Sequence, residues 1–150
     1  MDHPFSALER RNSLLRDSGL VVVAESYFDG PAPMAAWRPV ISGNAVPTVR
    51  VPYESGPDEY VPEVDRCWES VAEKLGVFGP GGDFLLSVGI DGMGALPWAH
   101  VRRGRNLSLA RHLADNPGDP EFVTMSVDGR VVCGVTSEEY DVWIVEASLA

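Results

Sequence analysis

Three histidines and two cysteines are the side chains of this sequence best suited to catalysis or metal binding. His100 and His112 stand twelve residues apart, whereas the ligands of a helical metal site recur every three or four residues. Cys133 follows two valines in a predicted strand, and no helix N-terminus precedes it that would lower the pKa of its thiol. We therefore expect no metal site, no cofactor and no covalent catalysis, and we expect both cysteines to be reduced thiols in the core.

A glycine-rich loop at residues 79–82 has the small residues of a phosphate-binding loop but not its charge. A P-loop ends in Gly-Lys followed by Ser or Thr, and here Asp83 stands where a positive charge is needed. The composition instead favours a connection between a helix and a strand. The loop is therefore not a predicted nucleotide site.

Arginines are concentrated in residues 100–112, a segment that contains no acidic residue. A basic strip of this kind inside an acidic protein is where an anionic metabolite would bind. One hypothesis is therefore a small enzyme or ligand-binding domain with an anion pocket in this segment. The residues predicted to line that pocket are Trp98, His100, Arg102, Arg103 and Arg105.

Acidic residues are concentrated between Glu54 and Glu73, where seven carboxylates stand against one base, Arg66. A second excess of acids covers residues 115–146. Aromatic residues on loops often anchor protein contacts, and the sequence places two tyrosines in a Pro/Gly loop before the acidic helix and a tryptophan in a proline-rich stretch. The predicted partner-binding residues are Tyr53, Glu54, Asp58, Glu59, Tyr60, Glu63 and Trp37. The alternative is an acidic helix face that is merely solvated.

The whole chain is acidic, because 12 Lys and Arg against 22 Asp and Glu give a net charge of −10. That charge repels phosphate backbones and anionic lipid, so neither nucleic acid nor a membrane is an expected partner. The start of the chain does not resemble a signal peptide, which favours a cytoplasmic location.

Small size, acidity and the lack of a catalytic constellation together predict a non-enzymatic domain that binds a basic protein, most concretely an immunity-type inhibitor of a basic toxin. A regulatory subunit whose contacts the sequence does not mark is a further alternative.

The elements that must position these residues begin with a helix over residues 7–17. Ser6 and Glu9 have the spacing of a capping box, and a glycine follows the segment as a stop signal. Residues 20–24 are apolar and contain three valines, which predicts a strand over residues 20–26 that is buried on both faces. Residues 27–44 contain three prolines and two glycines, which predicts a long surface loop.

The middle of the chain contains the clearest helical pattern, over residues 61–75, where apolar residues recur at helical spacing. We expect Trp68 to face the core there. The other predicted elements are an edge strand over 45–51, a strand pair over 84–90 and 95–101, and a helix over 107–114 capped by Asn106.

The last third of the chain predicts a meander of strands over residues 122–127, 130–135 and 140–146. Asp128-Gly129 predicts a two-residue turn in which both residues take positive φ. The expected fold is a single α+β domain over residues 1–150, with a mainly antiparallel sheet of five to seven strands and two or three helices packed on one face.

Overall fold

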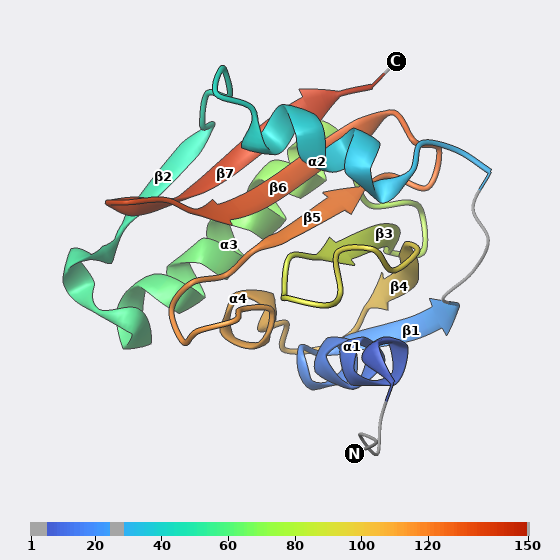
Figure 1. Ribbon diagram of the computed structural model, residues 1–150, viewed down its shortest axis with the longest axis horizontal. Coiled ribbons are helices and arrows are strands. Elements are labelled where there is room, and N and C mark those ends of the chain that lie inside the picture. Colours follow the sequence, from blue (N-terminus) through green and yellow to red (C-terminus); the bar gives the residue numbers. More distant parts are fainter. Residues whose placement is uncertain (1–5, 25–28, 150) are drawn as a thin grey trace.

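The computed structural model describes residues 6–24 and 29–149 of the chain. In these ranges the strands are β1 (Leu20–Ala24), β2 (Val49–Pro52), β3 (Asp83–Val88), β4 (Ala99–Arg103), β5 (Phe122–Met125), β6 (Val131–Ser137) and β7 (Asp141–Ser148). The helices are α1 (Ala7–Asp17), α2 (Pro33–Ile41), α3 (Pro57–Leu75) and α4 (Leu109–His112), with a 3-10 turn, η1 (Tyr53–Ser55), before α3. The strands form one antiparallel sheet in the order β1-β4-β3-β5-β6-β7-β2 (Figure 1). The predicted α+β class is confirmed.

The larger hydrophobic core lies between the sheet and the helices α1, α3 and α4. Trp68 of α3 stands at its centre with no exposed surface, and its indole N–H donates to the hydroxyl of Thr124 at 3.2 Å. Its ring contacts Phe78 and Phe122 edge to face, with centroids 5.6 and 5.7 Å away. The prediction that Trp68 faces the core is confirmed, and burial of these aromatic rings stabilises this side of the sheet.

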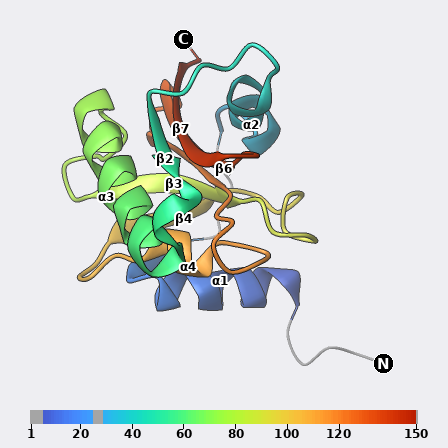
Figure 2. The ribbon, with the colours of Figure 1, turned by 90° about the vertical axis from the view of Figure 1, so that its left-hand side faces the viewer.

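The opposite face of the sheet is covered by α2, which lies across the sheet from α3 (Figure 2). The predicted loop is wrong here, because Pro33 occupies the first turn, where a helix does not use its N–H, and Pro39 comes only near the end. Ala36, Trp37 and Val40 are buried against the sheet. That burial outweighs the hydrogen bond lost at Pro39. Residues 25–28, where the predicted strand ends and the predicted loop begins, lie outside the described residues.

Helix α3 begins at Pro57, earlier than the predicted start at residue 61. Gly56 precedes it with φ +85°, and a first turn with Pro57 and two acids suits a helix N-terminus. The helix ends as predicted at Gly76, which takes φ +93°. Asp58 and Glu59 therefore lie in the first turn of α3 and not in a loop, whereas Glu54 lies in η1.

The prediction is correct for one edge strand of the sheet and wrong for the other. The strand β2 is an edge strand as predicted, paired only with β7. The strand β1 is the other edge, and the expectation that it is buried on both faces is wrong: Val21 is 51% and Val23 42% exposed. These two valines lie beyond the part of the second sheet face where α2 packs.

The predicted helix α1, its capping box and the pairing of β3 with β4 are confirmed. The turn between β5 and β6 is longer than predicted, because Ser126 pairs with Val131 and four residues lie between them. Gly129 takes φ +76°, but Asp128 does not take a positive φ. The helix α4 has a single turn with Ser108 at its N-cap, and Asn106, the predicted cap, instead takes φ +54°.

Candidate interaction surface

Two tyrosines form the structural centre of the acidic region. The rings of Tyr53 in η1 and Tyr60 in α3 meet edge to face with centroids 5.2 Å apart. The Tyr53 hydroxyl donates to the carbonyl oxygen of Glu138 at 2.6 Å, and the Tyr60 hydroxyl donates to that of Gly118 at 2.8 Å. Burial raises the pKa of both phenols. Tyr60 is only 6% exposed, so this pair holds the surface together more than it offers area to a partner.

On one side of the tyrosine pair lies an open hollow of about 540 Å³. Its lining residues are Val51, Pro52, Glu54, Ser55, Glu59, Tyr60 and Glu63. The structure thus brings together three of the acids predicted from the sequence. Arg66 hydrogen-bonds Glu63 and lowers the pKa of that carboxyl. Among the described residues, no ion pair involves Glu54 or Glu59.

Asp58 does not belong to this hollow, although the sequence grouped it with the other acids. It lines a different hollow together with Asp65 and Arg111. The reason is helical geometry, because neighbouring residues on α3 point to different sides. Asp58 therefore faces a surface where a base is already present.

On the other side of the tyrosine pair lies a second hollow of about 400 Å³. Its lining residues are Tyr53, Gly89, Asp115, Asn116, Asp119, Glu121, Ser137 and Glu138. Four of these described residues carry carboxylates and none is basic. Burial raises the pKa of Glu121, and the carboxylate of Glu138 raises it further. The sequence showed the acid excess in this part of the chain, but only strand pairing brings these loops together.

The Trp37 prediction fails because its segment forms a helix. Trp37 is 6% exposed, and its indole N–H donates to the hydroxyl of Ser87 at 2.9 Å. Both its ring and its polar atom are therefore used inside the protein. This side chain is not available as a contact anchor.

The basic strip of the alternative hypothesis is largely neutralised within the protein. Asp83 accepts from Arg102 Nε at 2.8 Å and lies 2.9 Å from His100 Nε2, and Arg102 is the main cause of the lowered pKa of Asp83. Arg103 contacts Glu69 at 3.2 Å.

Three further details separate these side chains from one another. The Arg103 guanidinium lies 4.0 Å from the centre of the Phe78 ring, which belongs to the larger core. Trp98 is buried on the smaller core, and its N–H donates to the carbonyl of Pro31. Arg105 is exposed beyond the end of β4. The predicted residues therefore do not converge on one anion.

The two cysteines and the possible metal ligands are the remaining candidates for a chemical role. Cys133 is fully buried and Cys67 half-buried, both are free thiols, and burial raises the pKa of each. Within the described residues, no group of three or more His, Cys, Asp or Glu side chains is arranged to hold a metal ion. None of the described helices has the length and apolar character needed to cross a membrane.

Comparison with known proteins gives no further guide, since no family model, no curated protein and no solved structure matches the chain. The geometry of the two acidic hollows is thus the basis for a functional assignment.

Proposed function

We propose that this protein is a non-enzymatic binding domain whose acidic surface takes a basic protein partner. The acidic surface is defined as the carboxylates of the two hollows, Glu54, Glu59, Glu63, Asp115, Asp119, Glu121 and Glu138. One observation carries the proposal: these seven carboxylates come from η1, α3 and the loops around β5 and β6, and they meet on either side of the Tyr53–Tyr60 pair.

Gathering like charges works against the folded state, and a cationic partner relieves that cost. At Glu121, burial raises the pKa and the neighbouring carboxylate of Glu138 raises it further. A Lys or Arg side chain entering the second hollow would favour the ionised form of Glu121 and lower that pKa. A basic partner therefore gains attraction from carboxylates such as Glu54 and Glu59, which take part in no ion pair among the described residues.

The backbone segments that carry these acids are joined to one another in the free protein. Tyr60 and Tyr53 fix the two hollows through hydrogen bonds to backbone carbonyls. The backbone of these segments therefore needs little reordering on binding, which reduces the entropic cost of association. The most concrete version of the proposal is an immunity-type inhibitor that covers the Arg and Lys side chains a basic toxin uses for its own anionic substrate.

The test compares two variants with the same change in charge. Glu54→Gln, Glu59→Gln and Asp119→Asn together remove three of the seven charges of the acidic surface, whereas Asp17→Asn, Asp29→Asn and Glu73→Gln neutralise three exposed acids that do not line either acidic hollow.

In capture from the native host, a basic partner should be retained by the parent and by the second variant and lost with the first. Equal retention by both variants, or capture of partners without basic character, would contradict the proposal.

A further inference from the structure

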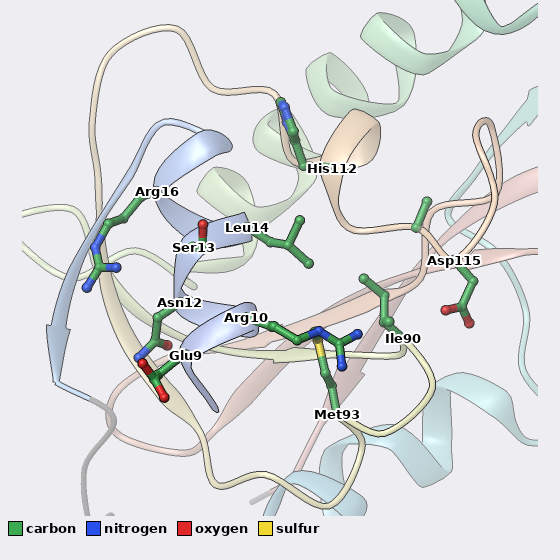
Figure 3. Close-up of a pocket in the computed structure, with 11 residues that line it drawn as sticks. Glu9, Arg10, Asn12, Ser13, Leu14, Arg16, Ile90, Met93, His112 and Asp115 are labelled. Atoms are coloured by element: carbon green, nitrogen blue, oxygen red, sulfur yellow. The ribbon is translucent and has the colours of Figure 1, made fainter. Parts of the chain in front are cut away.

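Another hollow lies between α1 and the connection from β3 to β4, and residues at the end of α4 and just after it also line it (Figure 3). Its volume is about 850 Å³, within the range of roughly 300–1,000 Å³ typical of sites for small organic molecules. Its lining residues include Glu9, Arg10, Leu14, Ile90, Met93 and Asp115.

One part of this hollow is apolar. Leu14, Ile90 and Met93 come from α1 and from the β3–β4 connection, and all three also pack on the larger core. Met93 is 2% exposed, while Leu14 and Ile90 keep part of their surface open to the hollow. A ligand with an apolar body would remove this surface from water.

The charged side chains around the apolar part differ in the partners that they have within the protein. Glu9 is engaged in the capping box, where its Oε1 accepts from the Ser6 backbone N–H at 3.2 Å and the Ser6 hydroxyl at 3.1 Å. Asp115 accepts from the backbone N–H of Asp91 through both carboxylate oxygens at 3.2 and 3.3 Å. The two acids of the hollow are thus used in holding its walls.

Arg10 is different, because none of the ion pairs among the described residues involves its guanidinium. Figure 3 shows this group directed toward Ile90 and Met93, whereas Arg16 and Glu9 point away from them. A guanidinium beside an apolar wall matches a planar anion with an apolar body, since it can donate two parallel hydrogen bonds to a carboxylate.

We propose that this hollow binds a small amphipathic carboxylate, with its carboxylate on Arg10 and its apolar body against Leu14, Ile90 and Met93. The site is separate from the acidic surface in function, although Asp115 lines both hollows.

The probe for this site is octanoate, titrated into the isotope-labelled protein and followed by NMR chemical shifts. We expect saturable shifts at the amides of Leu14, Ile90 and Met93. Octylammonium, which has the same chain and the opposite charge, should leave these amides unshifted. Binding of octylammonium at the same amides, or no saturable binding of octanoate, would overturn the proposal.

Two arginine substitutions test whether binding depends on Arg10 itself or on the positive charge of the protein in general. Arg10→Gln should weaken octanoate binding about tenfold, while Arg38→Gln in α2, an exposed arginine that does not line this hollow, should leave it unchanged. Asp115→Asn keeps an oxygen for Asp91 but removes a nearby negative charge, so it should tighten binding about two- to threefold. The arginines are exposed, so both variants should melt like the parent. Equal affinities for the two arginine variants would overturn the assignment of Arg10.

Discussion

The hydroxyl group of Tyr60 donates a hydrogen bond to the carbonyl oxygen of Gly118 at 2.8 Å, and so joins the start of α3 to the loop before β5. The approach is close because residue 118 has no side chain: a Cβ there would lie 2.3 Å from the Tyr60 oxygen. Gly118 also takes φ +90°, which glycine tolerates better than other residues. This contact ties together the two segments that carry the acidic hollows.

Removing the Tyr60 hydroxyl tests this link. Tyr60→Phe leaves a buried carbonyl without its partner and should lower the free energy of unfolding by about 1–3 kcal/mol, measured by urea denaturation. Tyr140 is 76% exposed, so Tyr140→Phe is the matched control and should change stability by less than about 0.5 kcal/mol. If the two variants unfold at the same urea concentration, the Tyr60 bond contributes nothing to the fold.

The orientation of α3 gives a second prediction. Trp68→Ala removes a fully buried indole and its contacts with three phenylalanine rings, and should cost about 3–5 kcal/mol in thermal or denaturant unfolding. Glu73 is exposed on the same helix, so Glu73→Ala should have almost no effect. Similar losses from both substitutions would contradict the packing described for α3.

The residues that the sequence placed correctly have local causes. The helix α1 follows from the Ser6–Glu9 capping box, and the core face of α3 follows from periodic apolar residues around Trp68. Both signals act within a few residues of the chain, so they can be recognised before the fold is known.

The errors share a different cause, which is tertiary contact. The helix α2 contains two prolines and forms because the sheet offers a surface for Trp37 and Val40, with Gly134 leaving room: a Cβ at Gly134 would lie 2.6 Å from a Val40 methyl carbon. The exposure of Val21 depends on the place of β1 at the sheet edge, which strand order alone decides. Neither fact is encoded in neighbouring residues.

The candidate site shows the same division. Glu54, Glu59 and Glu63 are close in sequence and share one hollow, and the local acid excess predicted them together. The second hollow was missed as a site because Asp115 and Glu138 meet only through the pairing of distant segments. An excess of acidic residues in the sequence therefore indicates a negatively charged region, whereas the fold determines which of its carboxylates lie in the same hollow.

Asp65 provides a pH-dependent prediction. Its carboxylate accepts from the Ala110 N–H of α4 at 2.9 Å, and burial raises its pKa from the ordinary 3.8 to about 6, against the opposing effect of hydrogen bonds from the backbone of α4. Between pH 4 and 6 the folded state therefore holds a proton that the unfolded state releases. By linkage, this group makes the protein less stable as pH rises through that window.

Asp65→Asn keeps the acceptor oxygen and removes the titration. Relative to the parent, the variant should gain about 1–3 kcal/mol of stability between pH 4 and pH 7.5, measured by urea unfolding at both values. Asp58→Asn, an exposed acid one helical turn or more away, serves as the control and should show little change between the two pH values. A constant difference between the Asp65 variant and the parent at both pH values would show that Asp65 does not titrate in this window.

The acidic surface makes the last prediction, which concerns association kinetics with the captured basic partner. Charge reversal at Glu54, Glu59 and Asp119 should lower the association rate at low salt at least about tenfold, because the surface then repels the partner it would otherwise attract. Reversal of Asp58 alone should have a smaller effect than reversal of Glu59 alone, since Asp58 shares its hollow with Arg111.

The salt dependence of the association rate distinguishes long-range electrostatic attraction from short-range contacts. Raising the ionic strength from about 0.01 to 0.15 M shortens the Debye length from about 30 to 8 Å, so the parent's association rate should fall while that of the triple variant rises or stays constant. The measurement is stopped-flow or surface-based kinetics at both salt concentrations. If neither salt nor charge reversal changes the association rate, the carboxylates around Tyr53 and Tyr60 are only solvated. Any partner then binds elsewhere on the protein.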